Sequence, residues 1–287
     1  MEVFTILRLG CHLSIAKGLD KTALMAQEIK AATFQFFTRN PRGGAARNIT
    51  DQEINNWIEV RSEKNLYPIV GHLPYAVNLA APKKNIHTFA ANVLSGDLER
   101  MDKIGAEYLV VHPGSHVGEG REKGINRIVK ALEISLLKFN GKSKLLLETM
   151  AGQGTEIGSL IEIRDIIKLC GTPPGLGVCL DTCHLFSAGY DLNKKEGVEI
   201  LLDDLQKYIG LEKVKVIHLN DSKYPLGSKK DRHELIGKGF IKKEGILNVL
   251  TQPAFKELPF ILETPAKGYL EYGEEIKLIK SWLEEEQ

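Results

Sequence analysis

The sequence predicts an α/β fold, a single (β/α)8 barrel or TIM barrel, with the active site at the C-terminal ends of its strands. Eight short β-rich runs alternate along the chain with longer stretches of helical periodicity. Several of these runs are almost continuously apolar, as expected for parallel strands that are covered on both faces. The length of 287 residues also suits a barrel, since such barrels commonly fill about 250 residues as one domain. An open, doubly wound sheet is the alternative arrangement.

The expected strands and helices alternate from one end of the chain to the other. Each expected strand is rich in branched or aromatic residues, and each expected helix repeats apolar residues at helical spacing, as Ile276, Ile279 and Leu283 do in the last one. No linker divides them, so we expect one domain over residues 1–287. The expected strands are 8–13, 32–37, 67–72, 107–113, 143–149, 176–182, 214–220 and 258–264. The expected helices are 19–29, 50–64, 87–104, 124–139, 157–169, 195–209, 242–250 and 273–283.

Composition and charge exclude several classes of protein. The 38 basic and 37 acidic residues give a formal net charge of +1, so any attraction to phosphate must be local. The four cysteines contain no CxxC pair, which favours a reducing cytoplasm over a secreted disulfide framework. The N-terminal stretch is interrupted by charge, and no run approaches about 18 apolar residues, so we expect neither a signal peptide nor a membrane span.

Polar residues of two kinds stand at the ends of the expected strands. A histidine or a carboxylate ends seven of the eight strands, and strand ends meet at the mouth of a barrel. Three further candidates are His184, one turn after Asp181, and the pair Asp231 and His233 in the long loop after the seventh strand. The seven strand-end residues are His12, His72, His112, Glu148, Asp181, His218 and Glu263.

Histidine nitrogens and carboxylate oxygens gathered in one place indicate a metal site. Taken singly, a strand-end histidine is usually structural, and a lone carboxylate can cap a helix or form an ion pair. The coincidence of seven of the eight histidines with four carboxylates at strand ends or in the loops after them favours ligands of zinc, manganese or iron. His87, inside an expected helix, is expected to be structural, whereas His12 and His116 stay open between structural and supporting roles.

Nine candidate ligands are too many for one tetrahedral ion. With bridging carboxylates they would hold two or three ions, and ions about 3.5 to 4 Å apart suit in-line displacement at phosphorus, which favours hydrolysis of a phosphodiester. Cys179 is expected to point into the barrel below Asp181, and Cys183 to be a packed thiol rather than a nucleophile. The nine candidates are His72, His112, Glu148, Asp181, His184, His218, Asp231, His233 and Glu263.

Six segments closely resemble the endonuclease IV family of apurinic/apyrimidinic (AP) endonucleases, and the resemblance runs from GCHLSIAKGL (10–19) to the last strand. It implies a zinc-dependent DNA-repair hydrolase that cuts double-stranded DNA on the 5′ side of an abasic site, leaving a 3′-hydroxyl and a 5′-deoxyribose phosphate. Trimming of blocked 3′ ends is a further implied activity, and a monomer is the implied state. The segments are HPGSH (112–116), LETMAGQGTEIG (147–158), GVCLDTCHLFSAGYDL (177–192), HLNDSK (218–223), GSKKDRHELIGKG (227–239) and ILET (261–264).

The resemblance also implies three zinc ions per chain, with manganese or iron able to take some positions. A hydroxide between the first two ions would attack the phosphorus, and Glu148 and Glu263 would shape its surroundings as the catalytic residues. The implied ligand sets are His72, His112 and the bridging Glu148; then Glu148, Asp181, His218 and Glu263; and finally His184, Asp231 and His233.

DNA contacts are implied less completely. In the family, loops after the second and third strands enter the duplex at the lesion, and here they carry Arg42 and Tyr75. Gly43, Gly44 and Ala76 follow them, which leaves open how the gap at the lesion is filled. Basic residues on the mouth-side loops would contact phosphates; they are Lys223, Lys229 and Arg232, together with Arg39, Arg47, Lys230 and Lys238.

Two other functions stay open at this point. Metal-dependent sugar isomerases and epimerases of similar barrel fold also gather carboxylates and histidines at strand ends, but they need only one or two ions. The extra histidines and the basic loops argue against that class. A barrel that only binds damaged DNA or stores zinc is the second alternative, although the open metal positions of such a site would be reactive.

Overall fold

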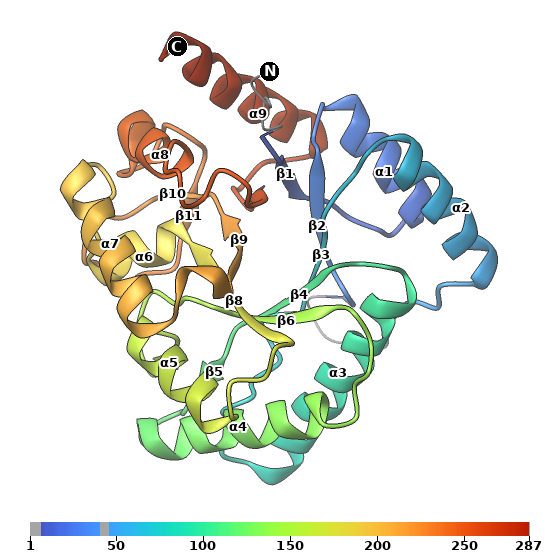
Figure 1. Cartoon of the computed structure of the whole chain (residues 1–287), viewed down its shortest axis with the longest axis vertical. Helices are drawn as coiled ribbons and strands as arrows, with labels where there is room; N and C mark the ends of the chain where they lie inside the picture. The colour runs from blue at the N-terminus through green and yellow to red at the C-terminus, as the bar shows by residue number, and fades with distance from the viewer. Residues whose placement is uncertain (1–6, 41–45, 287) are drawn as a thin grey trace.

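The computed structural model describes residues 7–40 and 46–286, and within them eight parallel strands close into a barrel (Figure 1). Neighbouring strands follow the order β1, β12, β9, β8, β6, β4, β3 and β2, and β1 pairs with β2 to close the ring. The predicted barrel is therefore confirmed, and the open sheet is wrong. The barrel strands are β1 (Leu9–His12), β2 (Thr33–Phe37), β3 (Ile69–His72), β4 (Tyr108–Val111), β6 (Lys144–Glu148), β8 (Leu176–Asp181), β9 (Val214–His218) and β12 (Phe260–Leu262).

A helix follows each barrel strand and packs against the outside of the barrel (Figure 1). All eight expected helices are present, although several begin a few residues from the expected position. The α5 helix begins at Leu160 rather than at 157, because Ser159 and Glu162 form a reciprocal capping box. The helices are α1 (Leu19–Glu28), α2 (Asp51–Glu63), α3 (Lys84–Lys103), α4 (Arg121–Leu136), α5 (Leu160–Leu169), α7 (Lys195–Tyr208), α8 (Lys242–Leu250) and α9 (Tyr269–Glu285). Among the described residues, no helix is both long and apolar enough to cross a membrane.

Several short elements were not expected from the sequence. The α6 helix begins after Asp181, whose carboxylate accepts a hydrogen bond from the His184 N–H at 2.8 Å, and it ends at Gly189, where φ is 120°. Two small antiparallel sheets join loops that leave the mouth side of the barrel. The short elements are α6 (Thr182–Ala188), β5 (Gly114–Ser115) paired with β7 (Glu156–Ile157), β10 (Asp221–Ser222) paired with β11 (His233–Glu234), and the 3-10 turn Leu211–Lys213.

Two apolar cores lie on either side of the barrel wall. The larger core fills the space between strands and helices and includes Phe34, Phe36 and Trp57. The smaller core fills the barrel interior and contains Cys179, whose inward direction was predicted. Its fully buried members are Val70, Val110, Leu146, Cys179, Val216 and Ile261. On each of these six strands the residue two positions later is a candidate ligand, so the interior core forms the floor of the site.

Candidate metal centre

Six candidate ligands form a ring above the interior core. Because side chains on a strand alternate between its two faces, a residue two positions after a core residue faces the same way. His72 lies two positions after Val70 on β3, and Glu148 lies two positions after Leu146 on β6. The same relation on the remaining strands places His112, Asp181, His218 and Glu263 at the mouth.

The nine predicted ligands converge, as barrel geometry requires. Their donor atoms form overlapping groups in which all atoms lie within 4.8 Å of one another. Three of the groups are those that the family resemblance implies, namely His72, His112 and Glu148; Glu148, Asp181, His218 and Glu263; and His184, Asp231 and His233. Two further groups of the same compactness combine His72, His218 and Glu263, and Asp181, Cys183 and His233.

Glu148 is fully buried and connects the first two groups. Its Oε2 lies 3.0 Å from His72 Nε2 and 3.1 Å from His112 Nε2. Its Oε1 lies 3.1 Å from His218 Nδ1. The two oxygens of one carboxylate therefore face different groups, which is the arrangement that a bridging ligand requires.

Asp181 and Glu263 complete the second group and are tied together by Asn220. His218 Nδ1 lies 3.1 Å from Glu263 Oε2 and 3.8 Å from Asp181 Oδ2. Asn220 Nδ2 donates to Asp181 Oδ2 at 2.7 Å, and Asn220 Oδ1 accepts from the Glu263 N–H at 2.7 Å. Asp181 thus caps α6 through Oδ1 and keeps Oδ2 toward the centre.

The third group joins α6 to the β10–β11 hairpin. Asp231 Oδ1 lies 3.1 Å from His184 Nε2 and 3.5 Å from His233 Nε2. Both Nε2 atoms are buried and make no hydrogen bond with any described residue. The opposite ring nitrogens are engaged, since His184 Nδ1 lies 2.7 Å from the Thr149 carbonyl oxygen and His233 Nδ1 lies 3.0 Å from the Glu263 carbonyl oxygen. Two buried, unbonded ring nitrogens beside a carboxylate are an arrangement that a bound cation would satisfy.

Charges within the cluster keep Glu148 and His184 ionised despite their burial, because they shift the pKa values of both groups. Burial raises the pKa of Glu148, but the neighbouring His218 and His112 outweigh it and hold that pKa well below its ordinary value. Burial lowers the pKa of His184, but the carboxylate of Asp181 and its neighbours raise it well above the ordinary histidine value. In the metal-free protein, imidazolium charge therefore compensates the buried carboxylates.

Cys183 is a buried thiol at the edge of the third group. Its Sγ lies 3.5 Å from the Arg232 carbonyl oxygen, and burial raises its pKa to about 12. A nucleophilic cysteine needs a lowered pKa. The structure thus agrees with the packed thiol predicted from the sequence.

The other histidines divide between support and structure. His12 Nδ1 lies 3.1 Å from Gln35 Nε2 and 3.5 Å from Glu263 Oε1, so His12 contacts the edge of the cluster. His87 Nε2 lies 2.8 Å from the Arg127 carbonyl oxygen and links α3 to α4, the structural role that was predicted. His116 Nδ1 accepts from the Gly120 N–H at 3.1 Å just before α4, which is also structural.

The predicted DNA contacts lie around the mouth, except for Arg42, which falls outside the described residues together with Gly43 and Gly44. Tyr75 is 62% exposed and lines the same cavity as the candidate ligands. Lys229 and Arg232 line a basic cavity of about 380 Å³ beside Tyr224. Lys223 is exposed directly after β10. The exposed Tyr75 therefore borders the cluster, and the three basic residues lie on the chain segment that also carries Asp231 and His233.

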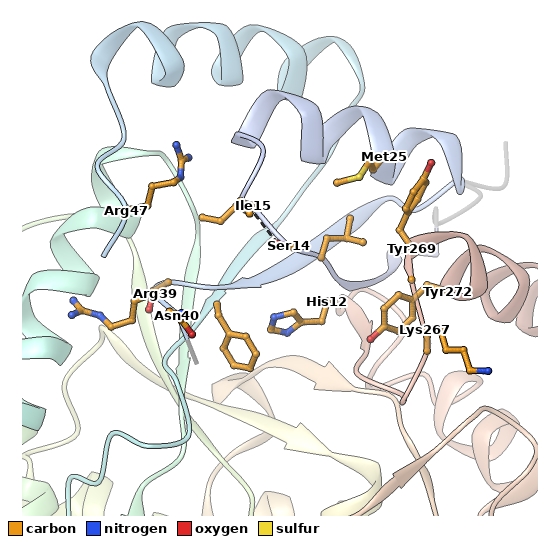
Figure 2. A pocket seen from close by; sticks show the side chains of 16 residues that line it. His12, Ser14, Ile15, Met25, Arg39, Asn40, Arg47, Lys267, Tyr269 and Tyr272 are labelled. Atoms are coloured by element: carbon orange, nitrogen blue, oxygen red, sulfur yellow. Dashed lines mark hydrogen bonds between the residues drawn. The ribbon is translucent and has the colours of Figure 1, made fainter. Parts of the chain in front are cut away.

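A second, larger cavity adjoins the metal cluster. It has a volume of about 750 Å³ and is enclosed by the loops after β1, β2 and β12 (Figure 2). Its mainly apolar wall includes Met25 of α1 and Tyr269 of α9 (Figure 2). It shares His12, Phe37 and Tyr272 with the cavity of about 280 Å³ that the candidate ligands line. The two cavities therefore form neighbouring parts of one hollow at the barrel mouth.

Two arginines proposed from the sequence as phosphate contacts pair with acidic side chains. Arg39 Nη2 lies 2.6 Å from Oδ1 of the buried Asp97, and in Figure 2 its side chain points away from His12. Arg47 pairs with Glu53 on α2. These two guanidinium groups consequently hold the loop after β2 against α2 and α3.

Gln35, Thr149 and Asn220 support the ligands but were not singled out in the sequence. Each lies in or directly after a barrel strand, and each uses an amide, a hydroxyl or a main-chain carbonyl rather than a charge. The Thr149 hydroxyl, for example, accepts from the Asp181 N–H at 3.0 Å. A strand-end position was the available signal, and it becomes informative once the barrel register is known.

Comparison with known proteins places the chain among TIM barrels with nuclease relatives. The family described as xylose isomerase-like TIM barrel matches residues 24–285. A probable endonuclease 4 of Moorella thermoacetica is 52% identical over 275 residues, which cover 96% of this chain and 98% of that protein. Endonuclease IV from Thermus thermophilus is 35% identical, with a TM-score of 0.85 over 97% of this chain and 99% of that one. A D-tagatose 3-epimerase-like protein, at 18% identity, 97% coverage of both chains and a TM-score of 0.67, shares the fold alone.

The closed barrel and the carboxylate and histidine cluster at its mouth define an enzyme of the xylose isomerase-like TIM barrel class. Because the D-tagatose 3-epimerase-like protein shares this fold, the barrel by itself does not distinguish a nuclease from an epimerase. The chain belongs to the endonuclease IV family of AP endonucleases. The resemblance found in the six sequence segments is confirmed, and the nuclease is favoured over the sugar isomerase.

Proposed function

We propose that this chain hydrolyses the phosphodiester on the 5′ side of an abasic site in double-stranded DNA, using three zinc ions bound by the nine clustered side chains. The products would be a 3′-hydroxyl and a 5′-deoxyribose phosphate. Membership of the endonuclease IV family supports the nuclease reaction. Three of the overlapping donor groups match the three ligand sets that the family resemblance implies, which supports the number of ions.

The direction of the histidine rings is the observation that carries the proposal. His72 Nδ1 lies 2.5 Å from the Leu73 carbonyl oxygen, which leaves Nε2 toward Glu148. His184 and His233 are held in the same manner, with their unbonded Nε2 atoms facing Asp231. A ring nitrogen can bind a metal ion when the opposite nitrogen carries the hydrogen and has a partner. The donor set of imidazole and carboxylate suits zinc, and manganese or iron can take some of the positions.

Two carboxylates would act on the attacking water. Bound zinc supplies positive charge that lowers the pKa of water and offsets the charge that develops on the phosphate. Burial raises the pKa of Glu263, but His218 and then His12 hold it well below the ordinary value, as His218 and His112 do for Glu148. Both groups are therefore ionised at neutral pH, can accept a hydrogen bond from the water, and can direct it at the phosphorus.

The rim of the mouth would bind the DNA. Tyr75 stands exposed beside the cluster, where its ring can contact the distorted duplex at the lesion. Lys229 and Arg232 line a basic cavity, and Lys223 is exposed next to the same hairpin, so these three are proposed to contact phosphates. Arg42, on the loop after β2, is proposed as a further contact. Contacts of this kind bind DNA without reading its sequence.

The same centre is proposed to trim blocked 3′ ends. A blocking group at a 3′ end is joined through a phosphate ester, so its removal needs the same attack on phosphorus. The hollow at the barrel mouth extends beyond the cluster into the cavity of about 750 Å³, which gives room for groups of different shape beside the reacting phosphate. Double-stranded DNA with abasic or 3′-blocked lesions is thus the proposed partner.

Incision of a duplex that contains a single tetrahydrofuran abasic analogue tests the function. We expect zinc-loaded protein to cut this strand on the 5′ side of the analogue and to leave an undamaged duplex of the same sequence intact. Chelation or Glu263→Gln should abolish the cut, whereas Glu234→Gln, on the β10–β11 hairpin but outside the donor groups, should preserve it. Zinc-loaded wild-type protein that leaves the analogue uncut but interconverts ketoses and aldoses would contradict the proposal and favour the isomerase.

A further inference from the structure

Gln35 lies on the one barrel strand, among those described, whose end offers no histidine or carboxylate to the centre. It belongs to β2, is fully buried, and is in register with His12 of β1. Phe34 and Phe36 on the same strand contribute to the outer core, so by alternation Gln35 faces the barrel interior. Together with His12 of β1, it therefore completes the ring that candidate ligands form on the other six barrel strands.

Three hydrogen bonds fix the orientation of the Gln35 amide. Its Oε1 accepts from His218 Nε2 at 2.8 Å. Its Nε2 donates to Glu263 Oε1 at 2.5 Å and lies 3.1 Å from His12 Nδ1. An amide has two N–H donors and one carbonyl acceptor, and all are used here. Exchanging the oxygen and nitrogen would set the amide oxygen against the ionised Glu263, so one orientation is favoured.

This orientation determines which atoms of His218 and Glu263 face the centre. The Gln35 oxygen can only accept, so His218 Nε2 must carry the hydrogen, and Nδ1 of the neutral ring keeps its lone pair. That Nδ1 lies 3.1 Å from Glu148 Oε1 and 3.1 Å from Glu263 Oε2. Because Gln35 engages Glu263 Oε1, it is the other oxygen, Oε2, that faces His218. The Gln35 amide thus orients His218 Nδ1 and Glu263 Oε2 toward the second donor group.

We infer that Gln35 is a positioning residue, which holds His218 and Glu263 in the ligand geometry of the second metal group. The inference rests on the proposed function, since it assigns Gln35 to one of the three proposed ions. Partners that fix the tautomer and direction of a metal ligand commonly contribute 10-fold to 100-fold, on the order of magnitude, to metal affinity. Gln35 acts through the ligands and needs no contact with the DNA.

The test is the zinc affinity of Gln35→Leu, which keeps a similar volume and removes all three hydrogen bonds. Zinc-loaded proteins are titrated with a chelator of known affinity, and the zinc left per chain is counted. We expect one ion to be bound about 10-fold to 100-fold more weakly, with the others unchanged. The matched control is Gln52→Leu on α2, where the exposed amide donates to Asn56 Oδ1 at 2.8 Å; this variant should match the wild type.

A second variant and a folding measurement separate positioning from general stability. Gln35→Glu keeps an acceptor for His218 but loses the donor to Glu263, so its zinc affinity should fall between the wild type and Gln35→Leu. Circular dichroism melts of the zinc-free proteins should show that both variants fold. Gln35→Leu that retains zinc as Gln52→Leu does, or that weakens every ion equally, would overturn the inference while leaving the proposed function standing. A wild type that binds no zinc and cuts no abasic duplex would overturn both.

Discussion

Asp97 is the buried acid that holds the loop after β2 on the barrel. Its carboxylate accepts from the Thr38 hydroxyl at 2.6 Å and from Arg39 Nε and Nη2 at 2.9 and 2.6 Å. Arg100, one turn along α3, donates to the main-chain carbonyls of Thr38 and Arg47 at 2.8 and 2.9 Å. Both ends of the loop that carries the proposed Arg42 contact are therefore attached to α3.

We predict that Asp97→Ala lowers the free energy of unfolding by about 3 kcal/mol, because it leaves Arg39 without its buried partner. Urea denaturation measures the change. Asp165→Ala is the control, since Asp165 pairs with Arg164 at the surface and an exposed pair contributes about 0.5 kcal/mol. Equal losses in the two variants would show that the buried network contributes no more than a surface pair.

The Cys183 thiol is predicted to be dispensable. Burial raises its pKa to about 12, so it is neutral at ordinary pH, and serine at this position can still donate to the Arg232 carbonyl oxygen. Cys183→Ser should therefore keep the full zinc content and the incision rate, whereas Asp181→Asn should lose zinc. Metal analysis and the abasic incision assay check both variants. A falling zinc count in Cys183→Ser would instead assign the thiol to the donor group that it forms with Asp181 and His233.

At the scale of secondary structure, the regular elements were predictable and the short ones were not. Continuous apolar runs such as Leu145–Leu147 identify barrel strands, because both faces of such a strand are buried. The α6 helix and the two small sheets escaped prediction because they are too short to show a hydrophobic period. Their signals are local, such as the Asp181 cap and the terminal Gly189 of α6.

The candidate site was predictable where the residue type alone indicates a metal ligand, as it does for histidine, aspartate and glutamate. Histidines and acids at strand ends indicate ligands, and the nine that were proposed do converge. Gln35 escaped notice because a single amide in an apolar strand gives no signal until the register places it beside His218. The acidic partners of Arg39 and Arg47 could not be predicted, because a sequence does not show which arginines pair with Asp97 or Glu53 in the fold.

The β10–β11 hairpin depends on the buried Asp221. Its carboxylate accepts four main-chain hydrogen bonds, from the N–H groups of Ser222 at 2.8 Å, Gly237 at 3.0 Å, Gly239 at 2.9 Å and Ile241 at 2.9 Å. These bonds fold the chain segment that presents Asp231 and His233 to the third donor group. Through the hairpin, Asp221 therefore helps to position two proposed ligands, Asp231 and His233.

Asp221→Ala is therefore predicted to bind one zinc ion fewer per chain. It should also lower the free energy of unfolding by about 3 kcal/mol, because it leaves several N–H groups unpaired. The ions of the first two groups should be retained, since their ligands lie on the barrel strands. Glu234→Ala on the same hairpin is the control, because its carboxylate accepts from the neighbouring Leu235 N–H and from no other main-chain group that the structure describes. Retention of all zinc in Asp221→Ala would show that the loop needs no such support.

For the molecule as a whole, the zinc-free state is predicted to be most stable in mildly acidic solution. The pKa values of Glu148 and Glu263 are lowered from 4.5, so their contribution is complete above pH 4.5 and is lost as the pH falls. The pKa values of His184 and His218 are raised from 6.5, so their contribution is complete below pH 6.5 and is lost as the pH rises. Urea denaturation of chelated protein should show a maximum between these two values, and a stability that increases steadily into alkaline solution would contradict the assigned charges.

The barrel brings together candidate ligands from distant parts of the chain. Six candidate ligands, which are far apart in sequence on strands from β3 to β12, lie above one layer of interior residues because each comes two positions after a member of that layer. The floor and the outer core do not depend on the ligands, so chelated protein should stay folded while losing activity. The stability of the scaffold is therefore independent of the ions that it is proposed to hold.

Anomalous X-ray diffraction at the zinc edge, from crystals of zinc-loaded protein, locates the proposed zinc ions directly. The predicted result is three zinc peaks at the barrel mouth, one in each donor group, with Glu148 contacting two of them. A single peak, or peaks remote from the nine side chains, would contradict the three-ion centre.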